Sequence, residues 1–247
     1  MILIVLGHLL GDFYLQTDKI ATKRKTMFGY MLLHCFLYSI AMYIVMIILT
    51  KNINVSIEIT CIISIVHVII DIVKNKICGK MQKYEAAIFA GDQAVHFSSL
   101  MVMGIIYRNY INTDILQYSF KGYTIEQWIT IMTAVLICWK PASILITLIF
   151  KEIPITIEQA NIEMVGSSDE DKENVKIGSL IGILEREIIL LLGLMGQYGA
   201  VGFVLTAKSL ARYKQLEKKA FAEKYLVGTL LSAFIAFGCV AMCYVII

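Results

Sequence analysis

The chain contains seven long apolar runs, and these constrain its fold more than any other feature. They are Ile2–Gln16, Met27–Leu49, Val55–Val73, Ala87–Tyr107, Trp128–Phe150, Gly178–Thr206 and Tyr225–Ile247. A helix of about 20 apolar residues crosses a bilayer. Hydrophobic residues make up 58% of the chain and charged residues only 17%, which argues against a soluble enzyme or a nucleic-acid-binding module. We therefore expect an all-α, polytopic membrane helix bundle of six to seven helices.

The domain organisation predicted from the sequence is one membrane domain interrupted by a single polar segment. Residues 1–150 form the first part of the bundle, and residues 151–176 form an acidic linker that we expect to be flexible. Residues 177–247 return to apolar helices. Within them, residues 207–224 have the composition of a basic amphipathic helix lying on anionic lipid at the cytoplasmic surface.

Three clusters of Lys and Arg, in Thr17–Thr26, Lys74–Ala86 and Ala207–Lys224, should all face the cytoplasm. The third cluster conflicts with this rule if each apolar run crosses once, so one run should be broken or re-entrant. Pro141 predicts a break in Trp128–Phe150, because proline removes a helix hydrogen bond. A three-residue glycine rhythm in Gly178–Thr206 predicts either close helix packing or a break. The sequence leaves both candidates open.

All four histidines lie inside apolar runs, and three of them have an aspartate one helical turn away. Ionisable groups are costly in a bilayer and usually mark function. The pairs are His8 with Asp12, His67 with Asp71, and Asp92 with His96, and His34 stands alone. A rise of about 1.5 Å per residue places all seven side chains in one layer of the cytoplasmic half of the bundle.

Imidazole and carboxylate groups are ligands for divalent metals, and Zn²⁺ or Mn²⁺ suits this set best. We therefore take His8, Asp12, His67, Asp71, Asp92 and His96 as the ligand pool. A metal-bound water is a hydroxide nucleophile near neutral pH, so hydrolysis at the membrane surface is the expected chemistry. His34, Arg186 and Lys140 are the candidate catalytic residues, and the candidate substrate-binding residues are Gln16, Gln93, Glu185, Lys208 and Arg212.

Structural interpretations of the same residues stay open. A His–Asp pair at i, i+4 can be a bond that fixes helix packing. Gln16 and Gln93 can be interhelical hydrogen-bond partners, and the basic residues can simply face anionic lipid.

Several of these segments together resemble an uncharacterised family of bacterial multi-pass membrane proteins, domain of unknown function 3307. The resemblance rests on HLLGDFYLQTDKIA at His8–Ala21, His34, HVIID at His67–Asp71 and DQAVH at Asp92–His96, with further likeness in IGSLIGILERE, AKSLAR and KYLVGTLLS of the second half. It implies a location in the bacterial cytoplasmic membrane and shared importance of these positions. It implies no particular reaction.

The function expected from the sequence is a membrane-embedded, metal-dependent hydrolase. Its substrate would be a lipid-linked or phosphorylated molecule reached from the cytoplasmic side, and its other contacts would be membrane lipids rather than nucleic acid. Two alternatives remain: a proton- or cation-coupled transporter or channel that uses the same His/Asp cluster, and a structural or regulatory membrane partner in which the cluster only locks the helices.

Overall fold

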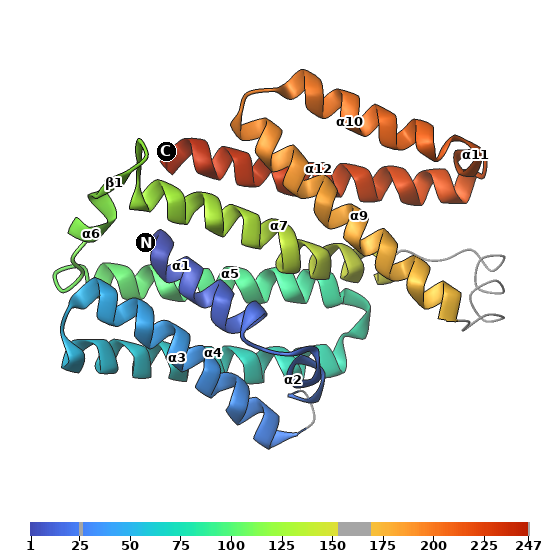
Figure 1. Ribbon diagram of the computed structural model, residues 1–247. Helices are drawn as coiled ribbons and strands as arrows, with labels where there is room; N and C mark the ends of the chain where they lie inside the picture. Colours follow the sequence, from blue (N-terminus) through green and yellow to red (C-terminus); the bar gives the residue numbers. More distant parts are fainter. Residues whose placement is uncertain (25–26, 153–168, 247) are drawn as a thin grey trace. The chain divides into compact units, whose positions relative to one another are not determined.

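The computed structural model describes residues 1–24, 27–152 and 169–246, and these residues are almost entirely helical (Figure 1). They form two compact units, Met1–Thr133 and Ala134–Ile247. The first unit holds α1 (Ile2–Leu9), the π-helical turn η1 (Leu10–Tyr14), α2 (Asp18–Lys23), α3 (Phe28–Thr50), α4 (Ile53–Lys80), the 3₁₀ turn η2 (Gln82–Tyr84), α5 (Glu85–Ile106), α6 (Asp114–Gln117), β1 (Ser119–Phe120) and β2 (Tyr123–Thr124). Helix α7 (Ile125–Glu152) begins in the first unit and continues into the second. The second unit adds α9 (Asp169–Leu194), α10 (Tyr198–Ala211), α11 (Tyr213–Leu216) and α12 (Lys219–Ile246).

The expected helical membrane architecture is confirmed. Among the described helices, five are long and apolar enough to cross a membrane: Phe28–Thr50, Ile53–Gly79, Glu85–Ile106, Ile125–Glu152 and Lys219–Ile246. A shorter apolar helix covers Ile2–Tyr14. The sheet is one small hairpin, in which Ser119 pairs with Thr124 and Phe120 with Tyr123. The protein is therefore a multi-pass helical membrane protein.

In the first unit, α3 packs beside α4 and α4 beside α5, while α1 and η1 pack against α3 (Figure 1). Two glycines let the N-terminal helix approach α3 closely. A Cβ on Gly7 would lie 2.7 Å from Val45 Cγ2, and a Cβ on Gly11 would lie 2.8 Å from Tyr38 Cδ2. Both distances are shorter than van der Waals contact, so any larger residue at these positions would push the helices apart.

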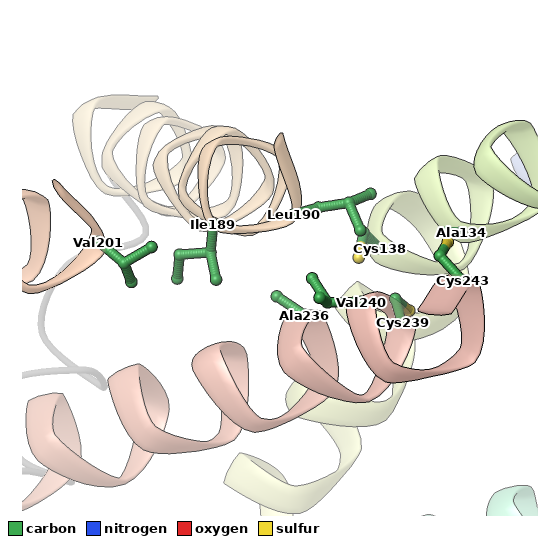
Figure 2. Packing of buried hydrophobic residues seen from close by; sticks show 9 residues of the cluster. All are labelled: Ala134, Cys138, Ile189, Leu190, Val201, Ala236, Cys239, Val240 and Cys243. Carbon is green, nitrogen blue, oxygen red and sulfur yellow. The ribbon is translucent and has the colours of Figure 1, made fainter. Parts of the chain in front are cut away.

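The second unit has a core of small and branched side chains. Figure 2 shows these side chains, which come from α7, α9, α10 and α12 and point toward one another. The core comprises Ala134, Cys138, Ile189, Leu190, Val201, Ala236, Cys239, Val240 and Cys243. Gly193 brings α9 close to α12, because a Cβ there would lie 2.6 Å from Val240 Cγ2. Small residues at helix contacts are typical of packing inside membranes.

The structure decides between the two predicted break points. Helix α7 continues through Pro141, so the break expected in Trp128–Phe150 is wrong. The run Gly178–Thr206 is the interrupted one: α9 ends at Leu194 and α10 begins at Tyr198, with Gly196 at a φ of +70° between them. Glycine adopts this left-handed conformation without a Cβ clash.

The reversal at Gly196 also removes the topological conflict. Lys208 on α10 contacts Glu185 on α9, 23 positions earlier in the chain, so the two helices run antiparallel. The basic segment after α10 therefore returns to the end of the unit at which α9 begins. The third basic cluster then no longer has to lie on the opposite side from the first two.

The basic segment 207–224 differs from the single amphipathic helix expected for it. It is divided among the last turn of α10, the short α11 and the first turn of α12. Its residues therefore cap a helical hairpin rather than forming one continuous surface helix. Of the expected acidic linker 151–176, Lys151 and Glu152 end α7, 153–168 lie outside the described residues, and the helical residues 169–176 begin α9.

Candidate metal centre

The first unit brings the four histidines and three aspartates into one buried cluster. Each of these side chains is at most 7% exposed. Potential ligand atoms lie within 4.8 Å of one another in three overlapping groups: His8, His67 and His96; Asp12, His34, His67 and Asp71; and Asp71, Asp92 and His96. We call these seven residues the His/Asp cluster. Their convergence from α1, η1, α3, α4 and α5 agrees with the single layer expected from the sequence.

Helical spacing aims most of these side chains at the cluster. On α4, His67 Nε2 lies 3.6 Å from Asp71 Oδ2, and on α5, His96 Nε2 lies 3.6 Å from Asp92 Oδ1. Both are i, i+4 pairs, whose side chains share one helix face. Asp12 is placed differently, because it lies in η1, where Leu15 N donates to Leu10 O at 2.8 Å. This i→i+5 pattern marks a π-helical turn, a feature frequent at functional sites.

Arg24, the residue that follows α2, places its guanidinium inside the cluster. Its Nη1 lies 3.4 Å from Asp12 Oδ1 and 3.2 Å from Asp71 Oδ2, and it also contacts His34 Nε2. Asp12, His34 and Asp71 all belong to one of the potential ligand groups. A protein cation therefore occupies the position that this group could offer to a metal ion.

A second part of the cluster contains potential ligand atoms that have no hydrogen-bond partner among the described residues. Among the described residues, Asp71 Oδ1, Asp92 Oδ1 and His96 Nε2 are buried and have no hydrogen-bond partner. His96 Nε2 lies 4.0 Å from Asp71 Oδ1 and 3.6 Å from Asp92 Oδ1, too far for good hydrogen bonds. Buried polar atoms are almost always paired, so three converging unpaired atoms need an explanation. We call Asp71, Asp92 and His96 the open triad.

Hydrogen bonds among the histidine rings suit the open triad to a cation. His67 Nδ1 lies 3.4 Å from His96 Nδ1, so one of these nitrogens carries the hydrogen of a shared bond. When His96 Nδ1 is the donor, its Nε2 keeps a free lone pair, as a metal ligand requires. The ring of Tyr38 stacks on His67, with centroids 3.7 Å and planes 7° apart, and its hydroxyl lies 3.2 Å from His8 Nδ1.

Polar side chains around the cluster join its members. Gln93 Nε2 lies 3.3 Å from Asp12 Oδ2 and 3.2 Å from Asp92 Oδ2, and Gln93 Oε1 lies 3.4 Å from His8 Nε2. Gln16 Nε2 donates to the backbone oxygen of Asp12. Both amides that were expected to bind substrate therefore have protein partners: Gln93 connects α5 with α1 and η1, as in the interhelical interpretation left open above, whereas Gln16 bonds within its own turn of the chain.

A cavity of about 360 Å³ adjoins the cluster at Arg24. Its other lining residues are Met27, Phe28, Met31, Ile72, Asn75 and Lys76. Since Arg24 both lines the cavity and reaches Asp12 and Asp71, one side chain connects the cavity with the buried carboxylates. The walls are largely apolar, and the cations at the cavity are Arg24 and Lys76.

Sequence reasoning missed three participants in the cluster: Arg24, Tyr38 and Lys74. Lys74 Nζ lies 2.6 Å from Asp92 Oδ2. Lys74 follows Asp71 by three residues and Tyr38 follows His34 by four, so helical spacing carried a signal for both. Arg24 had no such signal, because its position depends on the path of the chain between η1 and α3.

The remaining predicted site residues lie in the second unit. Lys140 is half-buried on α7, in the turn before Pro141. Arg186 is 3% exposed and binds protein atoms: its Nε donates to Cys138 O at 2.6 Å, Nη2 to Ser143 Oγ at 2.6 Å and Nη1 to Ser232 Oγ at 3.3 Å. It therefore braces α9 against α7 and α12. Glu185, Lys208 and Arg212 line a cavity in this unit together with Arg186.

Comparison with known proteins identifies the family of this chain. A family model described as "Protein of unknown function (DUF3307)" matches residues 1–125, about half of the chain, and the chain belongs to that family. The match covers the whole His/Asp cluster and ends before the segments of the second half in which a likeness was also seen. No curated protein and no solved structure matches the chain.

Proposed function

We propose that this member of the DUF3307 family is a membrane-embedded, metal-dependent hydrolase of the bacterial cytoplasmic membrane, acting on a lipid-linked or phosphorylated substrate. The observation that carries the proposal is the open triad, whose three ligand atoms are buried and, within the described residues, have no hydrogen-bond partner. Catalytic zinc sites typically use three protein ligands and leave a fourth position to water or substrate. Asp71, Asp92 and His96 supply such a set.

The spacing of the triad suits one ion. Ligand atoms bonded to zinc at about 2.0–2.2 Å in a tetrahedral site lie about 3.3–3.6 Å from one another. The distances from His96 Nε2, 3.6 Å to Asp92 Oδ1 and 4.0 Å to Asp71 Oδ1, need to shorten by only a few tenths of an ångström. His67 would orient His96 through its Nδ1, and Lys74 and Gln93 would hold Asp92 through its Oδ2. Such outer partners fix the orientation of ligands and tune the metal.

Charge balance gives a second argument. The cluster holds the carboxylates Asp12, Asp71 and Asp92, and its partner cations are Arg24 and Lys74. With neutral histidines, one negative charge remains uncompensated in a low-dielectric environment. A divalent ion carrying a hydroxide would neutralise that charge. A metal-bound hydroxide is also the nucleophile that metal-dependent hydrolysis supplies at neutral pH.

The cavity at Arg24 supports the proposed substrate class. Its apolar wall, with Met31 and Ile72, suits an acyl or isoprenoid chain. Arg24 and Lys76 suit the negative charge of a phosphate, for which the planar guanidinium is a preferred partner. A lipid whose phosphate lies at this cavity would have its ester bond next to the carboxylates that Arg24 contacts.

The test is turnover by the purified full chain in detergent with long-chain phospholipids and lipid phosphates, after loading with Zn²⁺ or Mn²⁺. We expect release of phosphate or a soluble head group. Chelation should stop the release, and readdition of the metal should restore it. Asp92→Asn should lower the turnover rate by at least about a hundredfold, within the range expected for an essential catalytic part. Asp114→Asn, at an exposed aspartate of α6, is the matched control and should keep the full rate.

Two results would overturn the proposal. One is a metal-free protein whose turnover is insensitive to chelator. The other is a metal-loaded protein that releases nothing from these lipids but carries metal ions across the membrane of proteoliposomes. The second result would assign the same cluster to transport.

A further inference from the structure

The second unit contains a cavity of about 330 Å³ that the proposed hydrolase does not use. Helix α9 lines it with one face, on which Gly178, Gly182 and Glu185 recur at helical spacing. Helix α12 contributes Gly228 and Thr229 to the lining. The glycines of α9 keep this space open, because a Cβ at Gly178 would meet nothing within 4 Å, whereas Gly228 of α12 allows the Phe150 ring to approach.

The cavity is strongly cationic. Arg186, Lys208, Arg212 and Lys224 line it, and its acidic lining residue is Glu185. Lys208 contacts Glu185 Oε2 and lies 3.2 Å from Thr229 Oγ1, so one of the four cations is partly neutralised. A net positive lining next to the membrane favours an anionic group.

The cavity also contains an unused acceptor. Glu185 is only 5% exposed, and within the described residues its Oε1 is buried without a hydrogen-bond partner. A carboxylate oxygen can only accept hydrogen bonds. A ligand that completes this site must therefore offer a donor, such as an ammonium or a hydroxyl group, close to its anionic group.

Apolar side chains complete the lining. Ile146 and Phe150 of α7, Ile181 of α9, and Phe221 of α12 lie around the cations. Lys224 Nζ lies 5.8 Å from the centre of the Phe150 ring, and Lys208 Nζ lies 5.1 Å from the centre of the Tyr225 ring. A ligand with hydrocarbon chains can therefore keep these chains in contact with protein while its polar end meets the charges.

We propose that this cavity binds a phospholipid whose head group combines a phosphate with a hydrogen-bond donor. The phosphate would meet Lys208, Arg212 and Lys224, and the donor would bond to Glu185 Oε1. Phosphatidylethanolamine and phosphatidylglycerol have such head groups. Phosphatidylcholine has the phosphate but no donor on its quaternary ammonium group. Arg186, which is already bonded to α7 and α12, would hold the floor of the site in place. The proposal does not depend on a metal or on hydrolysis.

The experiment is lipid retention by the purified full chain, measured by native mass spectrometry after exchange into defined lipids. Wild-type protein should retain phosphatidylethanolamine and phosphatidylglycerol about tenfold more strongly than phosphatidylcholine, the effect of one charge-assisted hydrogen bond. Glu185→Gln should remove most of this preference. Glycerophosphoethanolamine, which has the head group without chains, and inorganic phosphate distinguish a lipid site from a site for free phosphate. Neither should compete at concentrations that saturate the lipid.

Two variants provide the controls. Gly182→Leu places a larger side chain in the cavity and removes no charge. The cavity has room for this side chain, because a Cβ at Gly182 would meet only Arg186 Nη1, at 3.5 Å. The variant should abolish selective retention. Lys219→Gln removes a lysine whose side chain is 90% exposed and should leave retention unchanged. Equal retention of the three lipids by wild-type protein, or unchanged retention in Gly182→Leu, would overturn the proposal. Effective competition by inorganic phosphate would show an anion site with no preference for lipid.

Discussion

Exchanging His96 for glutamine should weaken the binding of a divalent ion far more than exchanging Asp12 for asparagine, although both residues lie in the same buried cluster. His96 Nε2 belongs to the open triad and, among the described residues, has no hydrogen-bond partner. Structural zinc sites with four ligands bind with about 10–16 kcal/mol, or roughly 3 kcal/mol per ligand. Loss of one triad ligand should therefore raise the dissociation constant by about a hundredfold or more.

Asp12 differs from His96 because both of its carboxylate oxygens already have partners. Oδ1 lies 3.4 Å from Arg24 Nη1 and 3.4 Å from His34 Nε2, and Oδ2 lies 3.3 Å from Gln93 Nε2. Asp12→Asn should therefore lower the free energy of unfolding by about 3 kcal/mol, since Arg24 loses a buried partner. Because these partners of Asp12 are not members of the open triad, the affinity for the metal should change by less than the roughly 10–100-fold that is typical of losing a direct hydrogen-bond partner of a ligand.

The assay is metal content after extensive dialysis, followed by titration against a fluorescent chelator to obtain the dissociation constants. Asp92→Asn provides a second triad variant of nearly unchanged volume and should match His96→Gln. Asp114→Asn also removes one carboxylate, as Asp12→Asn and Asp92→Asn do, but at an exposed position, and it should bind metal as the wild type does. Thermal unfolding with and without metal shows that each variant is folded.

Two outcomes would refute the reasoning. If Asp12→Asn weakens binding as much as His96→Gln, the ion binds where the Arg24 guanidinium lies rather than at the open triad. If wild-type protein binds no divalent ion at all, the unpaired atoms of the triad have another cause, and the proposed hydrolase loses its basis.

Three further variants test the packing. Gly11→Ala should lower the free energy of unfolding by about 1–3 kcal/mol, because the new Cβ would lie 3.2 Å from the Tyr38 backbone Cα, whereas Gly29→Ala has open space and should be neutral in thermal unfolding. Tyr38→Phe should cost about 1 kcal/mol in the same measurement, since it removes the hydroxyl bonded to His8 but keeps the stacked ring; a loss above 3 kcal/mol would contradict this account. Arg186→Met should destabilise the second unit by about 3 kcal/mol, because it removes three hydrogen bonds, and this loss should appear as lower resistance to protease. Arg212→Met, at a half-exposed site, should lower protease resistance much less.

Helical spacing made much of the His/Asp cluster predictable. His67 with Asp71, and Asp92 with His96, are direct i, i+4 contacts in the structure. Their common depth followed from the lengths of the apolar runs, because a membrane helix has a fixed rise per residue. The pair formed by His8 and Asp12 is different: the π-helical turn changes the register between them, and Gln93 connects the two.

The cations of the cluster could not be predicted with the same rules. Arg24 was assigned to a basic cytoplasmic segment, and the positive-inside rule already explained why a basic residue occurs there. Its side chain nevertheless reaches back into the bundle and is 15% exposed. A requirement for charge balance pointed to some cation, since three buried carboxylates are costly alone. This requirement did not identify Arg24, because tertiary structure decides whether a side chain from beyond a helix end reaches the cluster.

Asp71 connects the two cation positions of the cluster, and this leads to a prediction about Arg24. Asp71 Oδ2 lies 3.2 Å from Arg24 Nη1, while Asp71 Oδ1 belongs to the open triad. Arg24→Met would remove the guanidinium from the group formed by Asp12, His34, His67 and Asp71. The ligand atoms of these four residues lie within 4.8 Å of one another. The added negative charge should then recruit a second divalent ion, so that metal content rises from one ion per chain to two. Arg24→Lys keeps a cation and should stay at one. A content of one in both variants, with the methionine variant folded, would show that these four residues form an ion-pair site rather than a second metal site.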